Sequence, residues 1–380
     1  MSAAAAVRHA LVAREPDIST QVVDSYKYAA SMVSRVVSDG YIGMVKTIPQ
    51  MYRYIYNRAE RATEVGPFRT WIHQFSATNI RPLMERTKPD VVVCTHAFPS
   101  GVMAEYKRQF TDAPPVIGVV TDFAVHAFWV HDNIDCYAVA SEETCAALLQ
   151  RGVAAERVIV SGIPVGEQFA RPTSHREELK AALGLPGDRP VVLLMGGGLG
   201  IGPLQMMLRA LRRVDVPFSA VVIAGKSKRQ HQRVSEAAQL VEFPVRVLSF
   251  VENVYDYMHC SDLLISKPGG LTVSEALVSG LPMVLVKPLP GQEERNTRYL
   301  VDRGAAIRAR RERDLTEIVN ELLAANEKLS GMRAAGLALA KPNAAGDVAD
   351  AILRLARVRK GPPGDSPVIR AVPAEGWVSG

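Results

Sequence analysis

The stretch that decides the fold is Leu263-Leu264-Ile265-Ser266-Lys267-Pro268-Gly269-Gly270-Leu271-Thr272-Val273-Ser274-Glu275. Its apolar start is typical of a buried parallel strand, and the Pro-Gly-Gly turn separates this strand from a helix expected to begin near Thr272. Glu275 stands three residues after Thr272, which is the spacing of a capping box. A strand, a turn and a helix in this order form one unit of a doubly wound α/β sheet.

The same alternation of strands and helices extends along most of the chain. Short β-branched apolar runs predict strands at 91–94, 116–120, 137–140, 158–160, 191–195, 220–224, 245–248, 263–266 and 283–286. Helical patterns are expected at 2–14, in two or three pieces within 44–88, and at 100–109, 142–151, 174–183, 203–213, 227–239, 253–258, 272–279, 292–302, 314–329 and 346–358. The sequence therefore predicts an α/β protein of two doubly wound, Rossmann-like domains with a cleft between them.

Proline-rich breaks set the expected domain boundaries. These are an N-terminal domain at 1–163, a linker at 164–188, a C-terminal domain at 189–345, a helix at 346–358 and a disordered tail at 359–380. The 380 residues, 48% of them hydrophobic, exclude a disordered or collagen-like chain. No apolar run approaches the roughly 18 residues of a spanning helix, and no signal peptide is visible. The four cysteines form no CxxC pair and are expected to be buried, reduced thiols of a cytoplasmic protein.

Residues 41–88 are both basic and rich in aromatic side chains. They hold 8 Lys and Arg against 3 Asp and Glu, and 7 of the 24 aromatic residues of a chain whose net charge is +6. Cations attract anionic headgroups and aromatic rings favour the membrane interface, so this composition fits a surface that docks on an anionic membrane. A helical segment whose aromatic rings are simply core explains it equally well.

Ligands bind such sheets outside the carboxyl ends of the strands, so the loops after strands are the candidate sites. The strand at 191–195 is followed by Gly196, Gly197 and Gly198, a loop suited either to phosphate or to a tight turn. It lacks the dinucleotide fingerprint because residue 201 is isoleucine. Gly225-Lys226-Ser227 is no P-loop, because alanine stands at 220 where that motif needs glycine.

Two later loops carry the strongest signals. Lys267 and Thr272 flank the Pro-Gly-Gly turn, which together with the helix dipole predicts an anion site. Glu275 is either a ligand for a sugar diol or only the capping-box partner of Thr272. The loop from Lys287 to Asn296 carries amide and carboxylate side chains that suit hydroxyl groups.

These motifs together resemble the UDP-sugar domain of glycosyltransferase family 28, in the branch of monogalactosyldiacylglycerol synthases and processive diacylglycerol glucosyltransferases. Lys88-Pro89-Asp90, Thr121-Asp122-Phe123 and Gly162-Ile163-Pro164-Val165 extend the likeness over the first half. The resemblance implies a GT-B fold and an inverting, metal-independent transfer of a hexose from a UDP-sugar to a lipid hydroxyl. Its expected UDP-sugar residues are Gly196, Gly197, Gly198, Gly225, Lys226, Phe250, Val251, Lys267, Gly269, Gly270, Leu271, Thr272, Glu275, Gln292, Glu293 and Asn296.

The resemblance assigns parts to these residues. The backbone at Phe250-Val251 reads uracil and Glu275 holds the ribose. The glycine-rich loop and the segment from Lys267 to Thr272 hold the diphosphate, and Gln292 with Glu293 holds the hexose. No metal or other cofactor is expected.

A base must take the proton of the acceptor hydroxyl. Asp122 follows a strand at its cleft end and is the first candidate, and His96, after the strand at 91–94, is the second. An N-cap aspartate and a hydrogen-bonded histidine are the plain alternatives. The spacing of His126, Trp129 and His131 matches no strong zinc pattern, so these residues are expected to line the acceptor cleft.

The leading hypothesis is a peripheral enzyme of the inner face of the cell membrane that makes a glycolipid. Its expected partners are a UDP-sugar, a lipid acceptor and an anionic membrane surface, with no nucleic acid. A catalytically silent UDP-sugar-binding paralogue and a sugar-nucleotide epimerase of similar fold are the alternatives. Family members begin with an apolar strand and a turn ending in Gly-His, whereas this sequence begins at the helix that would follow. The sequence is therefore expected to lack part of its true N-terminus, through a misassigned start site, or else to be the silent paralogue.

Overall fold

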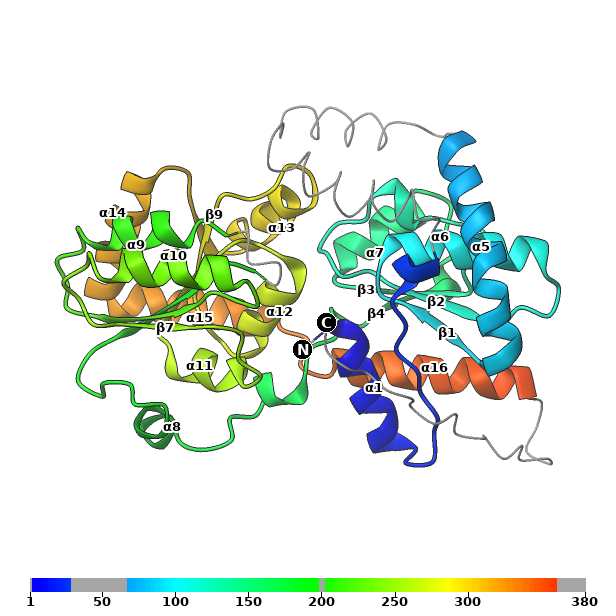
Figure 1. Ribbon diagram of the computed structural model, residues 1–380, viewed down its shortest axis with the longest axis horizontal. Helices are drawn as coiled ribbons and strands as arrows, with labels where there is room; N and C mark the ends of the chain where they lie inside the picture. The colour runs from blue at the N-terminus through cyan, green and yellow to red at the C-terminus, as the bar shows by residue number, and fades with distance from the viewer. Residues whose placement is uncertain (1, 29–66, 198–201, 361–380) are drawn as a thin grey trace.

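Two α/β units lie side by side in the computed structural model, which describes residues 2–28, 67–197 and 202–360 (Figure 1). Each unit is built around one parallel sheet, of four strands in the N-terminal unit and six in the C-terminal unit. Every recorded strand pair is parallel. Parallel strands need crossover helices that cover both faces of a sheet, which explains why the strands are continuous apolar runs.

The N-terminal sheet has its strands in sequence order. They are β1 (Val92–Cys94), β2 (Val116–Val119), β3 (Cys136–Val139) and β4 (Val158–Val160). The helices of this unit are α1 (Ala3–Arg14), α5 (Pro67–Thr87), α6 (Ala97–Gln109), α7 (Glu142–Leu149) and the last helix of the described chain, α16 (Ala344–Lys360). Side chains of α5 and α6 form a buried cluster on one face, and those of α1 and α16 form a second cluster on the other.

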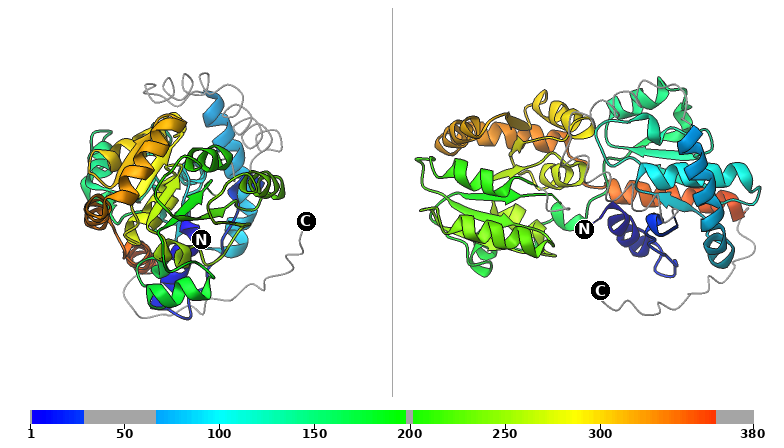
Figure 2. Two further views of the ribbon diagram at one scale, coloured as in Figure 1. Left: turned by 90° about the vertical axis from the view of Figure 1, so that its left-hand side faces the viewer. Right: turned by 45° about the horizontal axis from the view of Figure 1, so that its top comes forward.

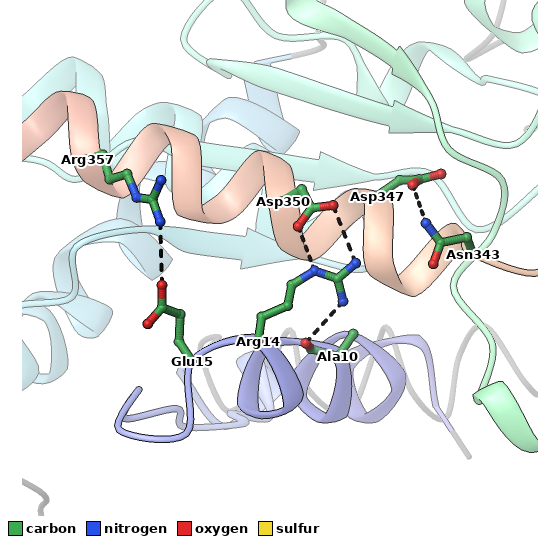
Figure 3. A network of polar contacts seen from close by, with 7 residues as sticks. All are labelled: Ala10, Arg14, Glu15, Asn343, Asp347, Asp350 and Arg357. Carbon is green, nitrogen blue, oxygen red and sulfur yellow. Dashed lines mark hydrogen bonds and ion pairs between the residues drawn. The ribbon is translucent and has the colours of Figure 1, made fainter.

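Helices α1 and α16 come from opposite ends of the chain and pack together under the N-terminal sheet (Figure 3). The Arg14 guanidinium donates to Asp350 at 2.5 Å and to the carbonyl oxygen of Ala10 at 3.3 Å. Arg357 lies 3.4 Å from Glu15 further along the same contact. These ion pairs are solvated, whereas Val7 and Leu11 are buried, so apolar burial holds the two helices together.

The C-terminal sheet has the order β10-β9-β8-β5-β6-β7. Its strands are β5 (Val191–Met195), β6 (Ser219–Ile223), β7 (Val245–Leu248), β8 (Leu263–Ser266), β9 (Met283–Val286) and β10 (Ala306–Ala309). Its helices are α8 (Arg176–Ala182), α9 (Leu204–Leu211), α10 (Lys228–Ala238), α11 (Val254–Cys260), α12 (Gly270–Val278), α13 (Gln292–Val301), α14 (Glu312–Ala324) and α15 (Asn326–Leu339). One buried cluster lies under α8, α11 and α12, and the other under α9, α10 and α14.

The chain passes between the units twice. It leaves the N-terminal unit after β4, and it returns between α15 and α16, so that α16 runs along the N-terminal sheet, as the right-hand view of Figure 2 shows. The two passages touch, because a Cβ atom at Gly162, whose φ is 89°, would collide with the side chain of Lys341. Glycine at 162 is therefore required both by its left-handed backbone and by this close approach.

All nine strands predicted from the sequence are present, with bounds shifted by at most one residue at either end. Strand β10 and helix α15 were not predicted. The helix after the Pro-Gly-Gly turn begins at Gly270 rather than near Thr272, and no side chain caps it, so the prediction of a capping box with Glu275 is wrong. The tail after 360 and much of the basic segment at 41–88 lie outside the described residues.

We expect the apolar contact of α1 to dominate the stability of the N-terminal unit. Leu11→Ala, at a residue 6% exposed, should destabilise this unit by about 2–4 kcal/mol, because it leaves a cavity beside the sheet. Arg14→Ala should cost at most about 1 kcal/mol, since its ion pair with Asp350 is partly exposed. Urea unfolding followed by tryptophan fluorescence measures both, with Arg8→Ala on the exposed face of α1 as control. Equal losses for Leu11→Ala and Arg14→Ala would contradict this account.

Candidate functional site

The order of strands in the C-terminal sheet reverses between β5 and β8, which are neighbours in the sheet but far apart in sequence. The chain winds outward from β5 through β6 and β7 in one direction, and from β8 through β9 and β10 in the other. Met195 pairs with Ser266 at the carboxyl ends of these two strands, and the Ser266 hydroxyl donates to the Met195 carbonyl oxygen at 3.2 Å. A crevice at such a reversal is the usual ligand site of an open α/β sheet.

The loop after β5 lies at this reversal of strand order. Gly197 has a φ of 79°, in the left-handed region that favours glycine. A Cβ atom at Gly202 would collide with the backbone of Gly196, so the two ends of the loop touch. Gln230 on α10 donates to the Gly202 carbonyl oxygen at 3.2 Å and fixes the end of the loop. Gly198, the third glycine of the predicted set, lies outside the described residues.

The loop after β8 brings the N-terminus of α12 to the same edge of the sheet. Gly269 is the N-cap with an extended backbone, and no side chain accepts from the first amides of the helix. Those N–H groups and the positive end of the helix dipole can bind an anion. Leu271 is half-buried and Thr272 is buried within the first turn.

Glu275 lies in the second turn of α12 and is only 6% exposed. Burial raises the pKa of its carboxyl to about 7. Since α12 begins five residues earlier and has no side-chain cap, Glu275 has no capping role that would account for a buried carboxyl. A buried carboxyl beside a helix N-terminus is suited to accept hydrogen bonds from hydroxyl groups of a ligand.

Lys267 and Glu293 form an ion pair at the start of α13. The distance from Lys267 Nζ to Glu293 Oε1 is 3.1 Å, with side chains 11% and 17% exposed. The other carboxylate oxygen accepts from the Leu289 backbone N–H at 2.6 Å, which fixes the loop before the helix. Gln292 begins α13 and is half-buried, after a Gly291 N-cap with a φ of 95°. The structure therefore places the predicted diphosphate lysine and the two predicted hexose residues next to one another.

The loops after β6 and β7 meet at the rim of the sheet. Gly225 has a φ of 78°, and the Nζ atom of the next residue, Lys226, lies 4.8 Å from the centre of the Phe250 ring. This cation–π contact orders an exposed lysine over a ring that is itself 51% exposed. Val251 packs against the core.

The N-terminal unit contacts α12 and α13 through the loop after β2. A Cβ atom at Gly270 would collide with the Thr121 carbonyl oxygen, so the first residue of α12 touches the backbone of the other unit. The Phe123 and Tyr299 rings stack with centroids 4.6 Å apart. The site is thus formed by both units, and α12 and α13 lie on the side of the C-terminal unit that faces the N-terminal one (Figure 1).

Asn296, on α13, makes three hydrogen bonds, of which two join the two units and one lies within the C-terminal unit. Its Oδ1 accepts from the Phe123 N–H at 2.9 Å, and its Nδ2 donates to Asp122 Oδ1 at 2.9 Å and to the Pro268 carbonyl oxygen at 3.0 Å. The residue is fully buried. Both amide hydrogens are used in these bonds, so the predicted contact between Asn296 and the sugar donor would have to involve its oxygen or a rearrangement.

Asp122 is the predicted residue whose electrostatics differ most from those of a surface carboxylate. Desolvation raises the pKa of its carboxyl to about 7, the hydrogen bond from Asn296 lowers it, and the nearby Glu293 charge raises it. A carboxyl that titrates near neutral pH is suited to accept a proton in a reaction at that pH.

His96 has a structural role that the sequence offered as an alternative. Its Nδ1 accepts from the Phe98 N–H at 3.3 Å and caps the N-terminus of α6. The side chain lies at the surface after β1. This geometry accounts for the residue without chemistry, and the catalytic assignment of His96 stays a prediction.

His126, Trp129 and His131 lie in and beside the 3₁₀ turn Ala127–Trp129, within the N-terminal unit. His126 Nδ1 accepts from the Phe128 N–H at 3.2 Å, and the Tyr137 hydroxyl donates to the Trp129 carbonyl oxygen at 2.9 Å. Trp129 is buried in the core. These two hydrogen bonds are internal to the N-terminal unit, and the predicted place of the segment in the wall of an acceptor cleft stays a prediction.

Over the described ranges, no three His, Cys, Asp or Glu side chains are grouped so as to hold a metal ion. All four cysteines are free thiols. Three of them are buried, as predicted, whereas Cys145 is only half-buried. The chemistry that the described site can offer is therefore an anion-binding helix terminus, two buried carboxyls that titrate near neutral pH and one lysine.

The sequence singled out Asp122 and Asn296 separately and missed that they touch. Pro268 and Thr121 were known only as parts of motifs. The Thr121 carbonyl oxygen lies in the contact between the units, and the Pro268 carbonyl oxygen holds Asn296 within the C-terminal unit. The sequence held one signal of this contact, the second glycine of the Pro-Gly-Gly turn. Neither Gly269 nor Gly270 has a positive φ, so the turn itself does not require glycine at these positions. The close approach to Thr121 explains the glycine at 270.

Two family models match the chain and divide it at the same place as the two sheets. The model described as monogalactosyldiacylglycerol (MGDG) synthase matches residues 1–165, and that described as the glycosyltransferase family 28 C-terminal domain matches residues 191–348. The chain is 31% identical over 312 residues to the processive diacylglycerol beta-glucosyltransferase of Bacillus pumilus (strain SAFR-032), which covers 82% of this chain and 80% of the relative. It is 30% identical over 312 residues to the protein of that name from Bacillus subtilis (strain 168), and the match covers 82% of this chain and 81% of that relative.

Solved structures with the same architecture include MurG of Acinetobacter baumannii, with a TM-score of 0.56 and 21% identity over 75% of this chain and 79% of that one. HepE of Anabaena in complex with UDP has a TM-score of 0.53 and 16% identity, and the match covers 73% of this chain and 82% of that one. The UDP-GlcNAc 2-epimerase of Neisseria meningitidis bound to UDP-GlcNAc has a TM-score of 0.53 and 16% identity. The match covers 77% of this chain and 84% of that one. At these identities the likeness shows the fold alone, which is GT-B as predicted.

We expect Glu275 to contribute to nucleotide binding. Glu275→Ala should weaken UDP binding by about 1.5–3 kcal/mol, the scale of a hydrogen bond to a charged group. Because burial raises its pKa to about 7, uridine, which carries no phosphate, should bind the wild type more tightly at pH 8 than at pH 6. Isothermal calorimetry measures both, with Glu236→Ala on the exposed face of α10 as control. A folded Glu275→Ala variant with wild-type affinity for UDP would exclude this role.

Proposed function

The chain belongs to glycosyltransferase family 28, in the branch of the MGDG synthases and processive diacylglycerol glucosyltransferases, and on that premise we propose that it transfers a hexose from a UDP-sugar to the hydroxyl of diacylglycerol with inversion at the anomeric carbon. The family makes it a glycosyltransferase of glycolipid synthesis. The UDP-sugar donor and the stereochemical course are the proposed part.

One observation carries the proposal: the N-terminus of α12 at the strand-order reversal touches the loop of Asp122. An anion site and a carboxyl with a pKa of about 7 are thereby brought together from the two units. Transfer to a hydroxyl needs both, because a diphosphate must leave on one side of the sugar while a proton is taken on the other.

The donor would lie along the carboxyl edge of the C-terminal sheet. We assign the diphosphate to the amides of Gly196, Gly197 and the first turn of α12, and the ribose to Glu275. The uracil would lie at the backbone of Phe250-Val251, and the hexose beside Gln292 and Glu293, where Lys267 neutralises the Glu293 carboxylate.

The reaction follows from this placement. The ionised Asp122 carboxylate takes the proton of the acceptor hydroxyl, whose oxygen attacks the anomeric carbon from the face opposite the diphosphate. The bond from that carbon to the diphosphate oxygen breaks, and UDP leaves with the electron pair. The helix N-terminus and Lys267 stabilise the charge that develops on the departing diphosphate, which costs no reorganisation because both are fixed beforehand.

A diacylglycerol acceptor requires contact with a membrane. None of the helices in the described ranges has both the length and the apolar character for a transmembrane span. We propose that the basic and aromatic segment at 41–88 docks on the anionic inner face of the cell membrane, which would place the acceptor next to the N-terminal unit.

The proposed reaction is tested by supplying diacylglycerol in mixed lipid vesicles with radiolabelled UDP-glucose or UDP-galactose. We expect label in the organic phase, as a β-linked hexosyl lipid by proton NMR if the donor is α-linked. Asp122→Asn should lower kcat by about 10²–10⁴-fold, the usual contribution of a general base. The wild-type kcat should rise with pH through about 7, as Asp122 ionises. A new soluble sugar nucleotide would instead indicate an epimerase, and tight UDP binding without turnover a silent paralogue.

Membrane docking is tested by a charge variant of the segment. Replacing Arg53, Arg58 and Arg61 with alanine should reduce binding to anionic vesicles by about 1 kcal/mol per charge, because each arginine loses its attraction to anionic headgroups. Added salt should weaken wild-type binding in the same way. Vesicle sedimentation measures both, with Arg311→Ala on the exposed start of α14 as control. Equal binding to neutral and anionic vesicles by the wild type would refute docking by charge.

A further inference from the structure

The contact through Asn296 is unusual among the contacts between the two units. The Arg303 guanidinium, in the turn after α13, also reaches Glu143 on α7, and the Phe123 and Tyr299 rings stack nearby. Each of these pairs joins one residue of each unit. The Asn296 amide instead touches three groups, two in the loop after β2 and one in the turn after β8.

We propose that Asn296 is a positioning residue that holds Asp122 in line with the donor turn across the boundary between the two units. This inference rests on the proposed role of Asp122 as the base. It assigns Asn296 a part that acts through Asp122 and Pro268, in place of a direct contact with the sugar. The group it holds on the C-terminal side is the carbonyl of Pro268, one residue before the N-cap of α12.

The hydrogen-bond inventory supports this role. A primary amide has two donors and one acceptor oxygen, and here both donors and the oxygen have partners at 2.9–3.0 Å. Asn296 is 0% exposed, so any substitution that removes one of these bonds leaves a buried polar group without a partner. Such a fixed group can hold reacting groups in line more accurately than a solvated one.

The bond to Asp122 also selects the form and the orientation of its carboxyl. Nδ2 donates to Oδ1, which favours the ionised carboxylate and leaves Oδ2 without a bond from Asn296. Glu293, on the same helix as Asn296, opposes ionisation of Asp122, and Lys267 after β8 is paired with Glu293. Without Asn296 the desolvation of the carboxyl and the Glu293 charge act unopposed, so the pKa of Asp122 should rise.

The experiment is the pH dependence of kcat for Asn296→Ala in the vesicle assay. We expect kcat at pH 7 to fall about 100-fold, the loss typical of a misplaced reacting group, with the KM for the UDP-sugar little changed. The acidic limb of the profile should shift to higher pH, so that part of the loss is recovered at pH 9. Asn296→Asp, which keeps the shape but removes both donors and adds a like charge beside Asp122, should shift the limb at least as far.

Two comparisons separate positioning from general loss of structure. Arg303→Ala breaks the ion pair with Glu143 but touches neither Asp122 nor Pro268, and its pH profile should coincide with the wild type. In the Asp122→Asn background, Asn296→Ala should cause no further loss of kcat, because it acts through Asp122. UDP affinity by calorimetry should remain for Asn296→Ala, which shows that the C-terminal unit is folded.

The outcomes distinguish this inference from the function on which it rests. If the wild type forms no glycolipid, the proposed function fails. Suppose that the wild type is active and Asp122→Asn is not. The positioning role alone is then overturned if Asn296→Ala keeps the acidic limb of the wild-type pH profile. It is also overturned if Asn296→Ala lowers kcat further in the Asp122→Asn background. A shift of the acidic limb of the kcat profile to higher pH in the two Asn296 variants, and not in Arg303→Ala, supports the positioning role.

Discussion

No side chain fits between the first residue of α12 and the Thr121 carbonyl oxygen, and the candidate site depends on this constraint. Gly270 lets the backbone of the C-terminal unit touch that of the N-terminal unit. A larger residue would separate the helix N-terminus from the loop that carries Asp122. The anion site and the carboxyl would then belong to two different surfaces, and the three bonds of Asn296 could not form together.

The sequence predicted the sheets well because their signals are local. A buried parallel strand is a short β-branched run, and each predicted run became a strand within one residue. Strand β10, Ala306–Ala309, was not predicted because arginine at 308 interrupts a short run that begins and ends with alanine. Helix α15 was missed because it follows α14 almost without a break, so that the two read as one pattern.

The site was predicted only in its separate parts, for a physical reason. Loops after strands can be found from the sequence, and so can the residue types that suit a phosphate or a hydroxyl. Whether two such loops touch depends on how two units pack, and that is set by contacts between residues about 174 positions apart, such as Asp122 and Asn296. The wrong expectation of a capping box at Thr272 has the same origin: the helix begins two residues earlier, at Gly270, where its backbone touches the Thr121 carbonyl oxygen of the other unit.

The return of α16 to the N-terminal sheet has a mechanical consequence. The two units are joined by two covalent passages rather than one, and these lie against each other at Gly162 and Lys341. A single connection would let one unit rotate relative to the other in any direction, whereas two adjacent connections reduce this freedom. A displacement of one unit past the other would pull these two passages apart, so the double connection restricts how the edges that form the site can shift relative to each other.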